Sequence, residues 1–258
     1  MRKICLILAL LIFVGCTNSC FTPPKRDLCI AGASFAYPEN GWFEIACQQI
    51  GCSGINKAVS GSNIIDVAML MSESKFFAPG EMERFDTFVI MHTHNFEVCR
   101  NVTEGYEINK NMSRSNAFDY VIRHYIELCR SLEFEPTSRW YGIEGGKRVD
   151  IILCTHWHDA RTKYNQSVRR LAERWKGYVT LCEFDANIGF TMDDYDPVTG
   201  QHISMLYAHE DANKSEKIDG KIYGWHPKRG RESEIQHRMA DIFVECYNRS
   251  AISANDSL

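Results

Sequence analysis

The sequence has few of the features that would point to a specialised class of protein. Its 258 residues contain no internal repeat, no low-complexity tract and no CxxC pair, and the last absence argues against a structural zinc site. The formal net charge is −4, so the charge gives no reason to expect a nucleic-acid partner. With 45% apolar and 24% charged residues, the composition is that of a globular chain long enough to bury a full core.

Only one long apolar run is present, at the N-terminus. Residues 4–14 are apolar and follow two basic residues. The run is too short to span a bilayer of about 30 Å, but it is typical of a signal peptide. The sequence Phe13-Val14-Gly15-Cys16 resembles a bacterial lipoprotein box. We therefore expect an exported protein, anchored in the bacterial cell envelope by a lipid on Cys16. A plain secretory signal, cut near Cys16 or Cys20, is the alternative.

The expected organisation is a single domain behind this signal. Residues 1–15 form the signal peptide, 16–26 a Pro-containing linker, 27–250 the domain and 251–258 a short tail. Of the 11 cysteines, Cys5 leaves with the signal and Cys16 takes the lipid, so an odd number remains and cannot all pair. Most of them sit in apolar segments and are expected to be small buried hydrophobes. Cys47 and Cys52 flank a helix end and can pair.

Short apolar runs alternate with segments of helical period along the domain. Five runs flanked by helices predict one parallel sheet that is covered on both faces. Two long polar stretches, about 96–116 and 185–224, are expected to be loops. The expected strands are residues 27–33, 54–59, 85–91, 148–154 and 178–184, and the expected helices are 40–50, 64–71, 117–132, 165–175 and 232–247.

Candidate catalytic residues follow the expected strands or stand on a late loop, where ligands of open α/β sheets bind. Ser34 follows the first strand, Gly61 the second and Asn95 the third, while His226 precedes the last helix. A serine on a tight turn can act as a nucleophile, a histidine as its base, and backbone or amide N–H groups as oxyanion donors. Taken singly, each residue is equally well explained as a turn, cap or structural residue.

The ordered set resembles the SGNH (GDSL-like) hydrolase family. Gly32-Ala33-Ser34 is similar to the Gly-Asp-Ser block, Val59-Ser60-Gly61 to the glycine block and Trp225-His226-Pro227 to the histidine block. The resemblance implies a three-layer αβα fold with a flavodoxin-like five-stranded parallel sheet of order 2-1-3-4-5. It also implies ester hydrolysis through an acyl-enzyme without a cofactor. Ser34 would be the nucleophile and His226 the base, with Ser34, Gly61 and Asn95 forming the oxyanion hole.

Three positions depart from the family pattern. Ala33 replaces the usual Asp beside the nucleophile, and the third block lacks its Gly-x-Asn-Asp form, so that His94 falls at the asparagine position in an ungapped match. Tyr223 stands three residues before His226, where the family places the triad Asp. Asp219 is the nearest upstream acid. The imidazole is therefore oriented by Asp219, by a backbone carbonyl, or not at all, as in a weak Ser-His dyad.

A second cluster of candidate residues follows the fourth strand. His156, Trp157, His158 and Arg161, together with His94 and Trp225, are candidate substrate contacts, with Trp157 as a platform for a sugar ring and Arg161 as an anion contact. A metal site built from His92, His94, His156, His158 and Asp159 is the alternative, although we expect no metal.

The expected function is that of a serine esterase that cleaves ester groups, with acetyl esters on carbohydrate as the expected substrate class. Its expected partners are this substrate and, through the lipid alone, a membrane. Two other functions stay open. One is a carbohydrate-binding lipoprotein that keeps the scaffold but has lost turnover, and the other is a metal-dependent hydrolase.

Overall fold

The computed structural model describes residues 27–38, 40–92, 101–210 and 214–255. The expected signal peptide, the lipidation site Cys16 and the linker, which together make up residues 1–26, lie outside these residues. His94 and Asn95 also lie outside them. Within the described part of the chain, no helix is long and apolar enough to cross a membrane.

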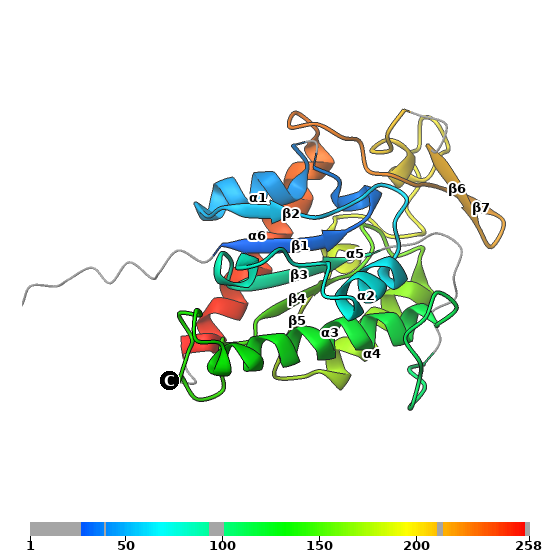
Figure 1. The fold of residues 1–258 in the computed structure, drawn as a ribbon. Helices are drawn as coiled ribbons and strands as arrows, with labels where there is room; N and C mark the ends of the chain where they lie inside the picture. The colour runs from blue at the N-terminus through cyan, green and yellow to red at the C-terminus, as the bar shows by residue number, and fades with distance from the viewer. Residues whose placement is uncertain (1–26, 39, 93–100, 211–213, 256–258) are drawn as a thin grey trace, which may run out of the picture.

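Five parallel strands form the central sheet, in the order β2-β1-β3-β4-β5 (Figure 1). This is the predicted strand order. The three inner strands are buried along their whole length, as expected for near-continuous apolar runs covered on both faces. The strands are β1 (Leu28–Gly32), β2 (Gly54–Asn56), β3 (Thr87–Met91), β4 (Ile151–Cys154) and β5 (Val179–Cys182).

Helices cover the two faces of the sheet, which confirms the three-layer fold (Figure 1). Because side chains alternate along a strand, Ile30 and Val89 pack toward one layer while Cys29 and Phe88 pack toward the other. The first layer holds α1 (Trp42–Ile50), α5 (Phe184–Asn187) and α6 (Glu234–Asn255), and the second holds α2 (Ile64–Ser72), α3 (Arg114–Ser131) and α4 (Thr162–Arg174). Helix α6 continues to Asn255, into the segment that was expected to be a tail.

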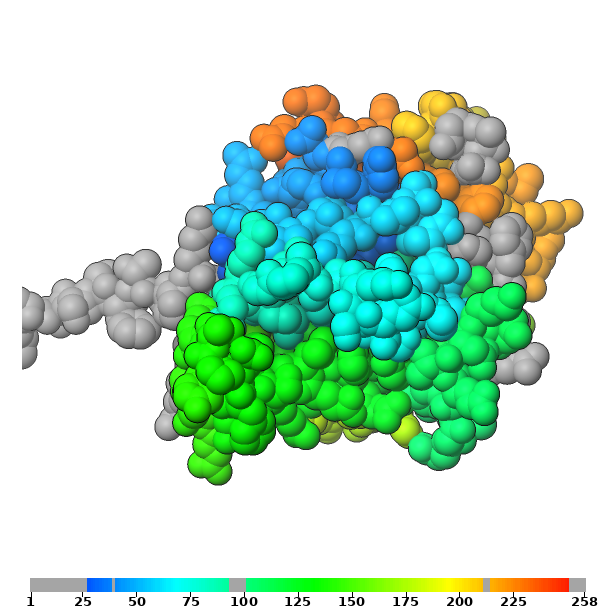
Figure 2. Space-filling model, viewed as in Figure 1, coloured from blue at the N-terminus to red at the C-terminus, as the bar shows by residue number. Residues whose placement is uncertain are grey.

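The long polar stretch 185–224 contains more structure than the sequence predicts. It holds the short helix α5, a 3-10 turn η4 (Ile203–Met205) and an antiparallel hairpin of β6 (Ser215–Ile218) and β7 (Lys221–Gly224). The hairpin projects from one end of the molecule (Figure 1). In the space-filling view, the yellow and orange residues of this region lie against the blue N-terminal part of the domain (Figure 2). The insertion thus covers the end of the sheet at which the candidate residues gather.

Candidate active site

Ser34 stands on a sharp turn at the end of the central strand β1. The chain leaves β1 at Gly32, passes an extended Ala33 and enters a 3-10 turn that begins at Ser34. A Cβ atom at Gly32 would lie 2.7 Å from the Cβ of Ala36, so the turn requires a glycine there. The Ser34 Oγ lies 2.8 Å from the Nε2 of His226, across 192 residues of sequence. The fold therefore brings the predicted serine and histidine into hydrogen-bond contact.

His226 is held between two aromatic rings. Its ring lies 5.0 Å from that of Phe35 and 5.3 Å from that of Trp225, and the Trp225 ring is nearly parallel to it, at 13°. The loop itself is fastened by two hydrogen bonds: the indole of Trp157 donates to the carbonyl of Trp225, and the N–H of His209 donates to the carbonyl of His226. Only 7% of His226 is exposed, so few other ring orientations are open to it.

Gly61 lies on a loop that the end of β1 holds in place. The N–H of Val59 donates to the carbonyl of Gly32 over 3.1 Å, and the hydroxyl of Ser62 donates to the carbonyl of Val59 over 2.7 Å. Gly61 has φ +80°, a left-handed conformation that favours glycine, and a Cβ there would meet no atom within 4 Å. The loop thus places an unobstructed backbone at the same edge of the sheet as Ser34.

The structure corrects the expectation that Asp219 orients His226. Asp219 stands at the tip of the β6–β7 hairpin. From there β7 runs about 10 Å to the open end of the hairpin, at the usual rise of about 3.3 Å per residue. The N–H of Trp225 donates to the carbonyl of Lys214, so the chain continues away from the tip before it reaches His226. A carboxyl group with a short side chain cannot span this separation.

Tyr223 occupies the family's acid position without replacing the acid. It is 2% exposed, and its ring stacks on His158 at 5.9 Å and packs edge-on against His202 at 4.6 Å. The tyrosine therefore belongs to the aromatic packing beneath the hairpin.

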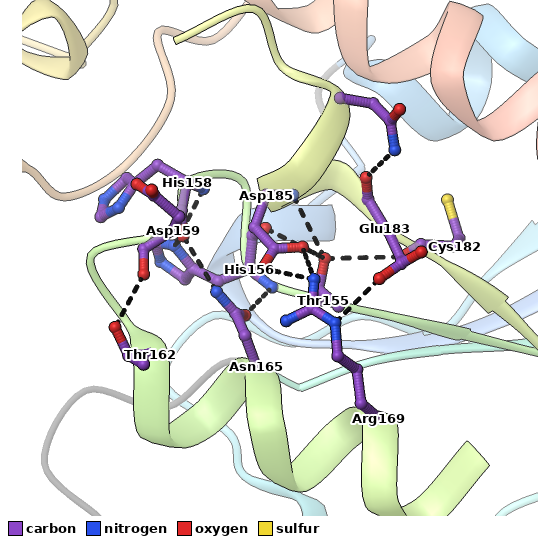
Figure 3. Close-up of polar contacts among 11 residues, drawn as sticks. Thr155, His156, His158, Asp159, Thr162, Asn165, Arg169, Cys182, Glu183 and Asp185 are labelled. Carbon is purple, nitrogen blue, oxygen red and sulfur yellow. Dashed lines mark hydrogen bonds and ion pairs between the residues drawn. The ribbon is translucent and has the colours of Figure 1, made fainter. Parts of the chain in front are cut away.

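The segment after β4 is buried, which corrects its predicted contact with substrate. Trp157 is 0% exposed, so it offers no face to a sugar ring; its indole instead supports the His226 loop. His156 and His158 are also fully buried. Asn165 of α4 binds both, accepting from the backbone N–H of His156 and donating to the carbonyl of His158 (Figure 3). The ring of His156 packs edge-on against Phe35 at 5.0 Å, so the segment supports the site from below.

Arg161 is likewise no open anion contact. Its guanidinium forms a part-buried ion pair with Glu216 of β6, which ties the hairpin to the start of α4. Among the described residues, His156, His158 and Glu216 also place possible ligand atoms within 4.8 Å of one another. However, Arg161 already neutralises Glu216, and the Nε2 of His158 lies 2.9 Å from the carbonyl of Gly224. These contacts already engage the Glu216 carboxylate and the Nε2 of His158.

A small pocket opens beside Ser34. It measures about 310 Å³, part of it open to solvent. Phe35 and Pro227 line it beside the nucleophile, and Glu44 and Arg229 supply charged groups. Sequence reasoning missed Phe35, Glu44 and Arg229, although the position of Phe35 directly after Ser34 was a usable signal. The pocket is a shallow, partly open hollow next to Ser34.

We predict that the buried histidines make folding stability sensitive to acid. Burial lowers the pKa of His158 to about 3 and that of His156 well below its usual value. In the unfolded chain both should titrate near 6.5, so stability is complete above that pH and falls as the unfolded state takes up protons. Each histidine contributes a slope of up to about 1.4 kcal/mol per pH unit below pH 6.5.

Urea denaturation at a series of pH values measures this slope. His158→Gln keeps a donor for the Gly224 carbonyl and should flatten the slope, whereas the exposed control His237→Gln should not. Equal slopes in wild type and His158→Gln would contradict the assignment.

One solved structure supports the fold. The chain resembles a carbohydrate esterase family 2 enzyme with a carbohydrate binding domain from Corynascus thermopiles (Myceliophthora fergusii), at 12% identity and a TM-score of 0.50 over 88% of this chain and 67% of that one.

Two bacterial structures are also similar. A member of the lipolytic protein G-D-S-L family from Veillonella parvula has 14% identity and a TM-score of 0.41 over 86% of this chain and 98% of that one. The psychrotrophic esterase EstA from a Pseudoalteromonas species has 10% identity and a TM-score of 0.44 over 87% and 98%.

The curated proteins contain no match to the sequence. The sheet order, the layers and the match to the carbohydrate esterase structure identify the fold as SGNH-like, as the sequence motifs predicted. A family model described as "Domain of unknown function (DUF5040)" matches residues 25–251. Because that match spans most of the sequence, the chain belongs to the DUF5040 family.

Proposed function

We propose that this chain is a serine-dependent ester hydrolase. The observation that carries the proposal is the 2.8 Å contact between the Ser34 Oγ and the His226 Nε2, on a tight turn at the carboxyl end of a central parallel strand. A nucleophile and a base within hydrogen-bond reach are the minimum that acyl transfer needs. The hollow beside Ser34 leaves the site open to solvent, from which an ester can approach.

The reaction follows from this geometry. The Ser34 hydroxyl attacks the ester carbonyl while the Nε2 of His226 takes its proton. The N–H groups of Ser34 and Gly61 and the amide of Asn95 stabilise the oxyanion. The imidazolium then gives its proton to the departing alcohol, which leaves an acyl group on Ser34. Water, deprotonated by His226, releases the acid and restores the serine.

The surroundings of the imidazole differ from those of a Ser-His-Asp triad. Tyr223 stands where the acid is expected, Asp219 lies at the tip of the hairpin, and the rings of Phe35 and Trp225 pack against the His226 imidazole. In a Ser-His-Asp triad, loss of a functional acid costs about 10⁴ in kcat. Because neither Tyr223 nor Asp219 supplies that acid, we propose that turnover is modest.

The proposed substrates are short-chain esters, with acetyl groups on carbohydrate as the first class to examine. Two points support this choice: the pocket beside Ser34 is small, and the structural neighbour from Corynascus thermopiles is a carbohydrate esterase. We further propose export by the signal in residues 1–15 and anchoring through Cys16, which would place the enzyme in the cell envelope among such esters.

Hydrolysis of p-nitrophenyl acetate by the purified protein tests the proposal, together with labelling by a fluorophosphonate. We expect turnover, its loss on labelling, and the label on the peptide that holds Ser34. EDTA should leave the rate unchanged. A rate that EDTA abolishes would instead support a metal-dependent hydrolase. Absence of turnover on any short-chain ester, with binding of acetylated oligosaccharides retained, would support the carbohydrate-binding alternative that the Tyr223 position favours.

A further inference from the structure

Helix α1 ends in a motif that brings two cysteines together. Gly51 adopts the left-handed conformation, with φ +75°, just after the last helical residue. Its N–H donates to the carbonyl of Gln48, and the N–H of Cys52 donates back to the carbonyl of Cys47 over 3.0 Å. These two bonds define a Schellman motif, in which the side chains at the two ends of the longer bond pack against each other. Here both of those positions are cysteine.

The end of the helix holds the two cysteines next to each other. Both residues carry thiols in the structure. The longer bond of the motif holds the two backbones close together, as a disulfide requires, since its Cα atoms lie about 4.4–6.8 Å apart. Gly54 leaves room beside them, because a Cβ there would lie 2.7 Å from the Cys47 Sγ. The backbone geometry of the motif therefore favours a bond between the two sulfurs.

The two cysteines differ in their exposure to solvent, and therefore in their access to an oxidant. Cys47 is 5% exposed, whereas Cys52 is half-buried and open to a reagent. The hydrogen bond with Cys52, and then burial, raise the pKa of the Cys47 thiol. Cys52 is thus the sulfur that an oxidant reaches first. The other described cysteines that are fully buried, such as Cys29 and Cys129, offer no comparable access.

We propose that Cys47 and Cys52 form an oxidation site, which closes to an intrachain disulfide when the protein meets a disulfide oxidant such as oxidised glutathione. The Cys52 thiolate attacks the oxidant, forms a mixed disulfide and releases one glutathione thiolate. The Cys47 thiolate then attacks the Cys52 sulfur and releases the second glutathione. The protein loses two electrons and two protons, and one oxidised glutathione becomes two reduced molecules. The bond would lock the last turn of α1 to the segment that leads into β2.

Oxidation of the full-length folded protein in a glutathione buffer tests the proposal. Mass spectrometry without reduction should show the tryptic peptide 27–57 lighter by two hydrogens, with no fragmentation between residues 47 and 52. A disulfide that closes so short a loop should raise Tm by about 4–8 °C, reversed by dithiothreitol.

Matched variants decide the pairing. Cys52→Ser should abolish both the mass loss and the rise in Tm, while Cys129→Ser should keep both. Cys29→Ser should also keep them, because Cys29 is in the same peptide but buried in β1. A mass loss that survives in Cys52→Ser would overturn the pairing. So would a glutathione adduct that stays on Cys52, or a peptide with three intact thiols in the folded, oxidant-treated protein. Each of these results is independent of whether the protein hydrolyses esters.

Discussion

Replacing Ser34 with alanine should lower kcat/KM for p-nitrophenyl acetate by at least about 10²-fold, while the protein keeps its fold. The change removes one oxygen atom at the start of a short turn whose backbone bond, from the Ala36 N–H to the Ala33 carbonyl, stays intact. What is lost is the attacking atom and its 2.8 Å contact with His226. The variant therefore loses the acyl-enzyme route altogether.

The expected size follows from how triad residues act as a unit. In a well-studied triad enzyme, removal of the serine costs about 2 × 10⁶ in kcat and removal of the aspartate about 3 × 10⁴, so a serine that works without the acid is worth about 10². If a carbonyl orients the His226 ring as well as an acid would, the loss will be larger. A loss of about 10² in kcat/KM is thus the smallest that we expect for Ser34→Ala.

The matched control is Ser72→Ala at the exposed end of α2, where the hydroxyl bonds only the carbonyl of Met69 among the described residues. It should hydrolyse the ester at the wild-type rate. The measurement is steady-state kinetics of both variants, with circular dichroism to verify the fold. A Ser34→Ala protein that retains wild-type kcat/KM would exclude Ser34 as the nucleophile.

The layers and the strand order were predictable because burial on both faces leaves a clear pattern in the sequence. The inner strands β1, β3 and β4 are buried along their whole length and almost entirely apolar, and helices alternate with the strands along the chain. The strand ends were less predictable. The second strand was expected to reach residue 59, yet β2 ends at Asn56, and only single hydrogen bonds such as that from Val59 to Gly32 continue alongside β1.

The pair at the centre of the site was predictable for a different reason. The ordered motifs around Ser34 and His226 resemble those of the SGNH family, and parallel strands end at one edge of the sheet, where a serine after β1 lies near the loops of that edge. The contact between Ser34 and His226 is consistent with this reasoning. The hairpin was not predictable, since its alternation is short and its sequence polar. Without it, neither the distance of Asp219 from His226 nor the ion pair of Arg161 could be inferred.

The same insertion explains why the segment after β4 was misread. Trp157 and His158 do lie at the correct edge of the sheet, where a ligand would be expected. Residues of the insertion cover them: Phe190 packs on Trp157, and Tyr223 stacks on His158. Exposure at a sheet edge depends on what the neighbouring loops do, and a long polar stretch carries little signal about that.

Replacing His226 with glutamine should also lower kcat/KM by at least about 10²-fold, because the side chain then has no group that can take the Ser34 proton. Glutamine is close to histidine in length and still fits between Phe35 and Trp225, so the loop should keep its place. The control is His124→Gln on α3, where the histidine ring stacks on that of Tyr120. This variant should retain activity.

The double variant gives the sharper test, since it asks whether Ser34 and His226 act as one unit. If they do, removing the second partner costs little once the first is gone, and Ser34→Ala/His226→Gln should be no more than about 2–3-fold slower than the worse single variant. Two residues that act independently would instead give losses that multiply, to about 10⁴. Multiplicative losses would show that the 2.8 Å contact is structural and that His226 acts on another atom of the substrate.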